Sequence, residues 1–584
     1  MNRLPSPQQS RARIGQGGKA PCLPKWSNLY LAMTLLSASA WLHAQDFGPP
    51  VPPGGESRPP AFLKPDQASP LLTAPAPEQA PEGKTATAGK TTRILVREIR
   101  VTGNTVFSDQ ELAQVTAPYV GREVTAEDLA ALRQALTLKY VKAGYINSGA
   151  LLPDQKVADG VIEYRIVEGR LTDITVTGAK RLHPDYVSDR LALGGGPPLN
   201  VNALQDRLQI LLQGPFIERI NAELSPGDRP GEARLNAKVE EGPRGNLSFT
   251  LDNDLSPSLG AVRSVLQGQW YSPSGRGDIL SGDLEYAQGY SKFSADYGIP
   301  LSASDTTLDI LAETSDAKVV EDPLNALDIQ SHESTLGLRL NHPVLHTANE
   351  QLSLAEGFDL RQSKSQLLGT GFAFTPGVEP DGKSQVSVFR FIQDYVARDR
   401  SQVIAARSTI SWGVDAFGAT NQGDDVPNGK FLAWLAQFQY AHRLGKSDSQ
   451  LVFRFDGQLT SKPLLPLEQF SVGGMRTVRG YRTNELVRDQ GYASSLELRV
   501  PVVRSEDGAP LLQLAPFVDV GGAWYKDRAT EEPHTLSSAG LGLRYDPRPG
   551  VHAELYWADA FQDVTNPSNS LQDRGWNLMF RADL

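Results

Sequence analysis

The sequence has one cysteine among its 584 residues, and this scarcity excludes several kinds of chemistry. That cysteine, Cys22, lies before the predicted start of the mature chain, so we expect no disulfides and no cysteine nucleophile there. The eight histidines lack the spacing of metal ligands, and no nucleophile elbow is present. We therefore expect no metal, no cofactor and no enzymatic activity.

An excess of basic residues and a long apolar run are also lacking. Asp and Glu outnumber Lys and Arg by 67 to 57, a net charge of −10, so nucleic acid is not an expected partner. Gly89-Lys90-Thr91 is similar to the end of a phosphate-binding loop, but its earlier glycine is misplaced and no strand precedes it. After residue 44 there is no stretch of about 18 apolar residues, which excludes helical membrane spans but not a β-barrel, whose strands alternate.

The amino-terminal segment has the pattern of an export signal. Several basic residues precede the apolar run 29–42, and Ala44 is the predicted cleavage point, with Ala40 as the alternative. Residues 1–44 are thus predicted to be a signal peptide. Residues 45–92 are rich in proline, alanine and glycine, a composition typical of an extended linker.

Two small α+β units are predicted to follow the linker. Residues 93–168 have the pattern strand, helix, helix, strand, strand, and residues 169–242 repeat that order. The segment Ile99-Arg100-Val101-Thr102-Gly103 of the first unit is matched by Ile174-Thr175-Val176-Thr177-Gly178 in the second. A capping box at Thr125 predicts where the longest helix of the first unit begins.

Helical periodicity disappears after Gly242, and about sixteen strand candidates follow. In the last of them Trp576, Leu578 and Phe580 share one face, while Asn577 and Arg581 lie on the other. Short turns and long loops alternate between the candidates, which is typical of an outer-membrane barrel. We predict a mainly β protein, with a 16-stranded antiparallel transmembrane β-barrel over residues 243–584. A soluble β-sandwich is the alternative, but it would not need so many strands.

One connection, at about residues 460–490, is far longer than a hairpin needs. Its centre, Ser471-Val472-Gly473-Gly474-Met475-Arg476-Thr477-Val478-Arg479-Gly480-Tyr481, combines paired glycines with arginines. In the strand that contains Phe517-Val518-Asp519-Val520-Gly521, alternation places Asp519 on the lumen face and Val518 on the lipid face. We therefore expect Arg479 and Asp519 to pair. A solvated glycine-rich loop is the alternative.

Several short motifs follow one another along the chain. They are Gly144-Tyr145 with Pro153, Gln155 and Gly160; Val167-Glu168-Gly169; Pro226-Gly227; Asp252-Asn253 with Gly260; Val478-Arg479-Gly480-Tyr481; and Phe517-Val518-Asp519-Val520-Gly521. In this order and spacing they resemble the two-partner secretion transporters, of the haemolysin-activator and filamentous-haemagglutinin-transporter type, within the superfamily that joins POTRA domains to a barrel.

The resemblance implies that each α+β unit is a POTRA domain that binds an unfolded exported client by adding strands to its sheet. It also implies that the long loop folds back into the lumen. The expected loop–barrel lock comprises Val478, Arg479, Gly480, Tyr481, Phe517, Asp519 and Gly521. The expected client-binding residues are Gly144, Tyr145, Pro153, Gln155, Glu168 and Gly169.

The chain departs from the family pattern in two places. Prolines stand where the family has a plug helix, and the chain ends in Leu584 where phenylalanine is common. The expected function is secretion of a large haemolysin- or adhesin-like exoprotein across the outer membrane of a Gram-negative bacterium without ATP, with or without its activation. The POTRA domains would lie in the periplasm, and lipid and the barrel-assembly machinery would be further partners. The alternative function is that of a barrel-assembly factor.

Overall fold

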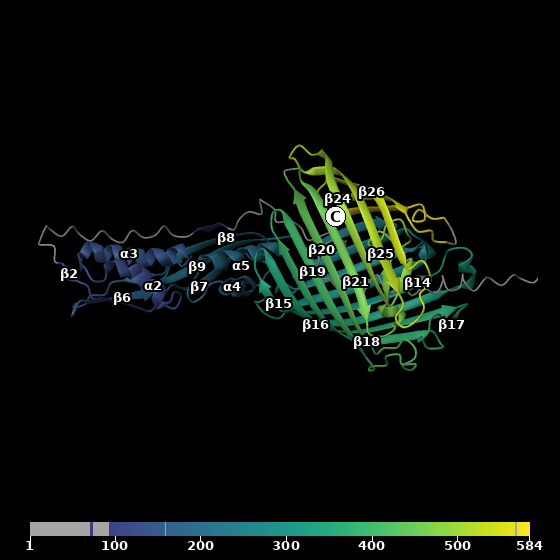
Figure 1. Cartoon of the computed structure of the whole chain (residues 1–584), viewed down its shortest axis with the longest axis horizontal. Coiled ribbons are helices and arrows are strands. Elements are labelled where there is room, and N and C mark those ends of the chain that lie inside the picture. The colour runs from purple at the N-terminus through teal and green to yellow at the C-terminus, as the bar shows by residue number, and fades with distance from the viewer. Residues whose placement is uncertain (1–70, 74–92, 158, 446, 567–568) are drawn as a thin grey trace, which may run out of the picture.

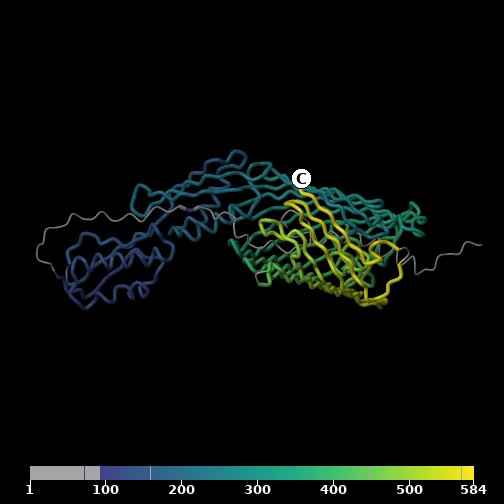
Figure 2. Tube along the Cα trace, turned by 90° about the horizontal axis from the view of Figure 1, so that it is seen from above, coloured from purple at the N-terminus to yellow at the C-terminus, as the bar shows by residue number. Residues whose placement is uncertain are grey.

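The computed structural model describes residues 71–73, 93–157, 159–445, 447–566 and 569–584. Within them, two small mixed α/β units lie in series beside a large barrel, and the molecule is elongated (Figures 1 and 2). The predicted signal peptide lies outside the described residues, as does most of the predicted linker.

The first unit packs two helices on a three-stranded sheet of order β3-β6-β5, in which β3 is parallel and β5 antiparallel to β6. The capping box forms as predicted, because Thr125 and Asp128 exchange side-chain and backbone hydrogen bonds. Leu129, Leu132, Leu136 and Tyr140 form the buried face of the longer helix. The elements are β2 (Ile94–Leu95), β3 (Glu98–Thr102), α2 (Asp109–Thr116), β4 (Glu123–Val124), α3 (Ala126–Lys142), β5 (Gly149–Leu151) and β6 (Val161–Val167).

The second unit repeats this topology, because its sheet has the order β7-β9-β8 with β7 parallel and β8 antiparallel to β9. A further strand, β1, extends the sheet by pairing parallel to β8. We predicted no strand in this part of the linker. The elements are β1 (Leu71–Thr73), β7 (Arg170–Thr177), α4 (Pro184–Ala192), α5 (Val201–Gln213), β8 (Ile217–Pro226) and β9 (Glu232–Glu241).

The barrel is closed by antiparallel pairing of its first and last strands, β10 and β28, and its sixteen long strands agree with the prediction. A two-residue strand, β17 (Thr370–Gly371), extends the hairpin of β16. The long strands are β10 (Gly245–Asp252), β11 (Arg263–Tyr271), β12 (Ile279–Ala287), β13 (Tyr290–Pro300), β14 (Thr307–Lys318), β15 (Gln330–His346), β16 (Glu350–Leu367), β18 (Lys383–Arg398), β19 (Gln402–Val414), β20 (Leu432–Leu444), β21 (Ser449–Thr460), β24 (Gln490–Arg504), β25 (Pro510–Trp524), β26 (Thr535–Arg548), β27 (Val551–Ala560) and β28 (Trp576–Asp583).

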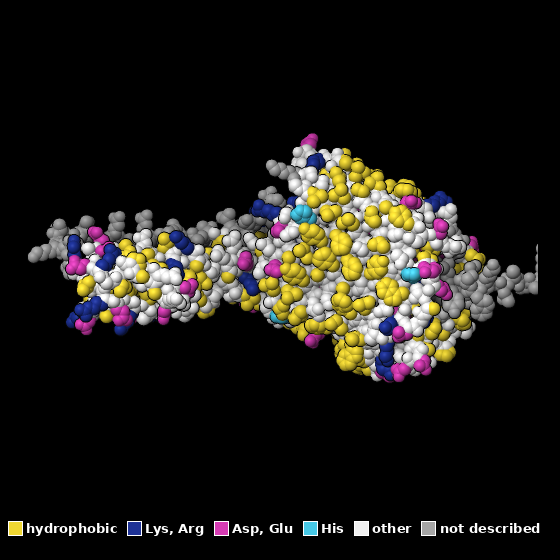
Figure 3. Space-filling view, in the orientation of Figure 1, with side chains coloured by type: hydrophobic (Ala, Val, Ile, Leu, Met, Phe, Trp, Pro, Cys, Tyr) yellow, Lys and Arg dark blue, Asp and Glu magenta, His cyan; other side chains and the backbone are white. Residues whose placement is uncertain are grey.

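The two faces of the barrel wall differ as strand alternation predicts. In β28, Trp576 and Phe580 are exposed on the outside, whereas Asn577 and Arg581 are buried inside. Figure 3 shows apolar side chains spread over the outer face of the barrel, with charged side chains gathered at its ends and on the α/β units. No helix in the described part of the chain is long and apolar enough to cross a membrane.

Candidate functional site

The connection between β21 and β24 folds into the barrel. Its two short strands, β22 (Phe470–Val472) and β23 (Leu486–Arg488), pair as an antiparallel hairpin. Their apolar side chains are buried in one cluster with residues of the wall, namely Leu435, Ala493, Ala523 and Leu536. The loop is therefore packed against the wall rather than solvated. We call this hairpin and its tip, residues 461–489, the inner loop.

Two glycines allow the tip of the inner loop to touch the wall. Gly480 has a φ of +93°, which L side chains rarely adopt, and a Cβ there would lie 3.0 Å from the Cβ of Ala558. Gly521 is on the facing strand, β25, and a Cβ there would lie 2.7 Å from Val472 and 2.9 Å from Val478. Both predicted positions thus mark a close approach of loop and wall.

Arg479 is almost fully buried and forms the predicted pair with Asp519. Its Nε and Nη2 donate to the two carboxylate oxygens of Asp519 at 2.8 Å each, and its backbone N–H donates to the same carboxylate at 3.0 Å. The guanidinium carbon also lies 3.4 Å from the centroid of the Phe517 ring. A bidentate pair of this kind fixes both the position and the orientation of the guanidinium, whereas a lysine ammonium could fix only the position.

A second acid, Glu497, joins the pair of Arg479 and Asp519. Arg479 Nη1 donates to Glu497 at 2.6 Å, and Nη2 donates to the hydroxyl of Ser495 at 2.9 Å. Glu497 in turn accepts a hydrogen bond from Arg499 at 2.7 Å. Arg479 is therefore the centre of a buried charge network rather than one half of a pair.

Tyr481 fixes the other side of the tip. Its hydroxyl donates to the backbone oxygen of Ser537, at 2.9 Å, and accepts from the backbone N–H of Gln562. Val478 is fully buried beside it. The structure therefore brings all seven residues of the predicted loop–barrel lock to one place.

A second buried arginine of the inner loop, Arg482, joins two loops at the barrel end. Both of its Nη atoms donate to the carboxylate of Glu321, at 3.0 Å each, in the loop between β14 and β15. Its Nε and Nη2 donate to Asp573, at 2.6 and 2.7 Å, in the loop between β27 and β28. We did not predict this anchor, because neither acid lies in a segment whose periodicity orients its side chain.

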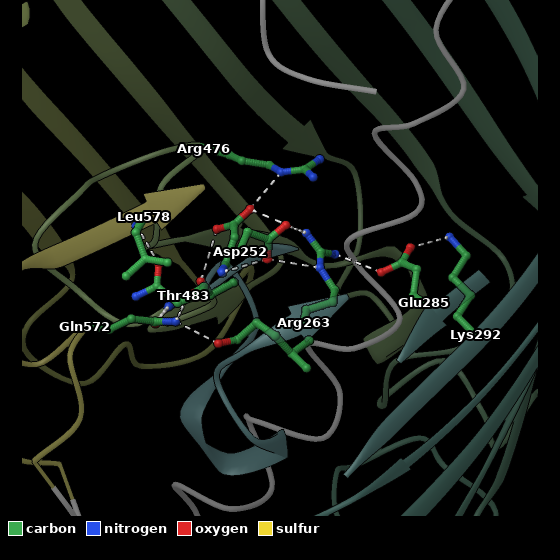
Figure 4. Close-up of polar contacts among 11 residues, drawn as sticks. Asp252, Arg263, Glu285, Lys292, Arg476, Thr483, Gln572 and Leu578 are labelled. Atoms are coloured by element: carbon green, nitrogen blue, oxygen red, sulfur yellow. Dashed lines mark hydrogen bonds and ion pairs between the residues drawn. The ribbon is translucent and has the colours of Figure 1, made fainter. Parts of the chain in front are cut away.

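Polar contacts also connect the inner loop to the two strands at which the barrel closes (Figure 4). Arg476 donates to Asp254, which follows β10, at 2.9 Å. Thr483 N–H donates to Gln572, which precedes β28, at 2.8 Å, and Gln572 donates to backbone oxygens of Asn253 and Leu255. The inner loop thus bridges the first and last strands.

A row of charges continues along the wall from that bridge (Figure 4). Arg263 donates to Asp252, at 3.0 Å for the shorter bond, and to Glu285 at 2.8 Å. Lys292 lies 3.7 Å from Glu285 and 3.1 Å from Glu313. Charged side chains of this row and of the Arg479 network line a polar cavity beside the inner loop. Among the described residues, no group of three or more potential ligands could hold a metal ion.

The six predicted client-binding residues do not form one cluster. Gly144 and Gly169 lie where the two units meet, because their backbone oxygens accept from Val201, at 3.0 Å, and from Leu199, at 2.7 Å, in the second unit. Tyr145 is half-buried next to Gly144 and contacts the Tyr140 ring edge-on. Three of the six thus lie at or next to the joint between the units.

The other three lie within the first unit. Pro153 and Gln155 belong to the connection between β5 and β6, and the Gln155 amide exchanges two hydrogen bonds of 2.8 Å with the backbone of Glu163. Burial raises the pKa of Glu168, but hydrogen bonds from Thr105, Val106 and Tyr140 outweigh it and leave that pKa below its usual range.

Comparison with known proteins agrees with this architecture. The family model "Haemolysin secretion/activation protein ShlB/FhaC/HecB" matches residues 231–545, which is more than half of the chain. The chain belongs to this family. A second model, the ShlB-type POTRA domain, matches residues 94–169, so the first unit is a POTRA domain. The second unit has the same topology, and we name it POTRA 2 after the first, POTRA 1.

Relatives of this transporter are known by sequence. The chain is 25% identical over 463 residues to the heme/hemopexin transporter protein HuxB of Haemophilus influenzae, covering 74% of this chain and 77% of that protein. It is 24% identical over 448 residues to the outer membrane transporter CdiB of Escherichia coli, covering 73% and 71%. The chain is thus an outer-membrane transporter of the two-partner secretion type, and its POTRA domains lie in the periplasm.

Solved structures share the fold. The structure of CdiB from Escherichia coli matches with a TM-score of 0.66 at 21% identity, covering 87% of this chain and 94% of that chain. A structure of BamA from Haemophilus ducreyi that lacks POTRA domains 1–3 matches with a TM-score of 0.52 at 14% identity, covering 84% and 100%. The barrel-assembly protein is therefore the more distant likeness.

Proposed function

We propose that this transporter captures one large exoprotein in the periplasm through its POTRA domains and passes it through the barrel once the inner loop has moved. The observation that supports the proposal is that buried ion pairs hold the inner loop inside the barrel. Arg479 holds the loop inside the lumen by directional contacts with Asp519 and Glu497, and Arg482 holds it at the barrel end. Such contacts can break and re-form without disturbing the wall.

The lumen suits an extended, hydrated polypeptide. Arg263, Glu285 and Lys292 line it on one side, and Arg499 and Arg544 on another. Paired charges of both signs keep water at the wall, and the segments of a passing chain find no large apolar surface there. Because the sequence has no nucleotide-binding motif, folding of the exoprotein outside the cell would supply the driving force.

The remaining partners follow from the surface. The apolar outer face of the barrel would contact lipid, and the barrel-assembly machinery would insert the closed sixteen-stranded barrel into the membrane. In POTRA 1, we assign Pro153, Gln155 and Glu168 to the client-facing side. Gly144, Tyr145 and Gly169 would hold the joint between the POTRA domains at the angle that a client spanning both requires.

The test is a comparison of protein compositions in the native host. When the gene for this chain is deleted, we expect one large protein to disappear from the culture supernatant and its fragments to remain in the periplasm. The wild-type chain should restore secretion. Separate measurement of the activity of the secreted protein tells whether the transporter also activates it.

The alternative function gives a different result in the same experiment. A barrel-assembly factor would leave the supernatant unchanged, while several unrelated outer-membrane proteins would lose their heat-modifiable, folded form. That outcome would contradict the proposal.

A further inference from the structure

A segment of the predicted linker occupies one edge of the POTRA 2 sheet. Leu71, Leu72 and Thr73 pair in parallel with Asn221, Ala222 and Glu223 of β8 (Figure 1, the short purple segment beside β8). Leu72 packs against the apolar core of POTRA 2, to which Ala222 and Leu224 belong. Without this segment, β8 would be the outermost strand of the sheet.

The contact is short compared with the edge that it covers. It pairs with residues 221–223 only, whereas β8 has ten residues. Pro70 and Pro75 flank the segment in the sequence, and a proline cannot donate a backbone hydrogen bond to a sheet. Neither proline could add a donor to the ladder, so the two prolines limit how far this strand can lengthen.

We propose that Leu71–Thr73 is a tethered cap on the client-binding edge of POTRA 2, and that an incoming client strand displaces it. This proposal rests on the proposed function, because it specifies where and how the exoprotein is first bound. Hereafter we call this segment the cap strand.

The register defines the partner that would replace the cap strand. Ile220, Ala222 and Leu224 of β8 are buried toward the core, whereas Asn221 and Glu223 are exposed on the other face. A client strand would therefore run parallel to β8 with an apolar side chain at every second position. It would lack proline and could use all ten residues of the edge, and so form more ladder hydrogen bonds than the cap strand.

The tether explains why a short strand can protect the edge at all. Residues 74–93 connect the cap strand to POTRA 1, so its local concentration at β8 is on the order of millimolar. A weak strand at that concentration prevents chance pairing with another exposed edge, which is a common route to aggregation. A longer client strand displaces the cap strand because each added residue forms further backbone hydrogen bonds with β8.

The first test measures binding of a defined strand to the purified full-length protein in detergent. The probe is a fluorescent ten-residue peptide of alternating threonine and valine with a lysine at each end. Leu72→Asp removes the apolar contact of the cap strand, and we expect it to tighten binding of the probe roughly tenfold over wild type. Leu71→Ala is the matched control, since its strand partner is the exposed Asn221, and it should bind as wild type does.

Two results of this test would overturn the proposal. One is equal binding of the probe by the wild-type and Leu72→Asp proteins. The other is equally tight binding of a second peptide in which the two central valines are prolines, because such a peptide cannot form the ladder.

The second test locks the cap strand in place. Leu72 and Ala222 are partners in the register, and neighbouring strands bring Cα atoms within the range that a disulfide spans. Only Cys22, in the predicted signal peptide, is present otherwise. In the Leu72→Cys, Ala222→Cys double variant, oxidation should abolish both binding of the probe and secretion of the exoprotein, and a reductant should restore both. Each single variant should be insensitive to oxidation.

The outcomes separate the cap from the transporter function. If the disulfide does not form, or if the oxidised double variant still binds the probe or secretes normally, the cap proposal is wrong while the proposed function stands. If deletion of the whole gene removes no protein from the supernatant, the proposed function itself is wrong. In that case the proposal that a client displaces the cap strand is wrong as well, and a change in probe binding would show only that the cap strand covers the edge of β8.

Discussion

The barrel and the POTRA domains bury different kinds of side chain. Inside the barrel, the largest fully buried side chains are Arg479 and Arg482, each paired with two acids. Inside the POTRA domains they are Tyr140, Tyr164, Ile162 and a set of leucines. An apolar core loses stability gradually as it is trimmed, whereas a buried charge network fails when one member is lost, because the partner charge remains buried. The region that we propose to open during transport is thus the one held by charges.

The two POTRA sheets also differ, although their topology is the same. In POTRA 1 the edge strand β5 has only three residues, and beyond it the Gln155 side chain occupies the backbone groups of Glu163. In POTRA 2 the equivalent strand β8 has ten residues and carries the three-residue cap strand. The same fold thus has a long edge covered by a three-residue strand in one copy and a short edge in the other.

The largest expected effect comes from removing the centre of the charge network. Arg479→Ala leaves Asp519 buried without its cation and leaves Glu497 with Arg499 alone, which costs about 3–5 kcal/mol locally. We expect secretion to fall to background while the barrel still assembles, as heat-modifiability on gels would show. The control is Arg574→Ala, at an exposed arginine in the loop between β27 and β28, and this variant should secrete normally. Normal secretion by Arg479→Ala would mean that the network does not govern transport.

A swap of the charges at positions 479 and 519 tests whether Arg479 belongs to a simple ion pair with Asp519 or to a larger charge network. From the sequence alone, Arg479→Asp with Asp519→Arg should recover part of the secretion. In the structure the new Asp would lie beside Glu497, whose carboxylate is 2.6 Å from the present guanidinium. We therefore expect little recovery from the swap and more when Glu497→Gln is added. Secretion by the double and triple variants decides this, and equal secretion by both would contradict a network.

The difference between the two POTRA edges can be tested by unblocking the first. Gln155→Ala frees the backbone groups of Glu163 and should cost POTRA 1 about 1 kcal/mol. In the oxidised protein with the locked cap strand, the threonine–valine peptide should then regain weak binding. Gln213→Ala, on α5 of POTRA 2, is the matched control and should not restore it. If the peptide still does not bind, an unblocked strand edge in POTRA 1 is not enough for client binding.

The smallest expected effect is a pH dependence confined to POTRA 2. Burial raises the pKa of Glu241, but backbone N–H donors of Leu182, Lys180 and Arg181 outweigh it and lower that pKa from 4.5 to about 2. Because the folded pKa is depressed, this stabilisation is complete above the unfolded pKa of 4.5 and is lost as pH falls toward about 2.

Protease resistance of POTRA 2 between pH 5 and pH 3 is the measurement for this effect. Glu241→Gln should be less resistant than wild type at pH 5, and the difference should shrink as pH falls. Glu240→Gln, at an exposed neighbouring position, should follow wild type throughout. A constant difference across the range would contradict the role assigned to Glu241.

Local periodicity determined much of this protein. A strand repeats every two residues, so the sequence alone placed Asp519 inside and Val518 outside, and the structure has them there. A helix with a capping box likewise predicted its own start at Thr125. These features depend only on residues close in the chain.

Tertiary structure decided what no local pattern could. Glu321 and Asp573 lie in long loops and meet Arg482 only because the barrel closes, and Glu497 becomes the second acid of Arg479 because two neighbouring strands adopt one particular register. The cap strand is three residues long between prolines, too short for any periodic signal, and it exists only because β8 supplies its hydrogen-bond partners. Long-range pairing of short segments has no period in the sequence, so the contacts that hold the inner loop and the cap strand could be found only in the folded molecule.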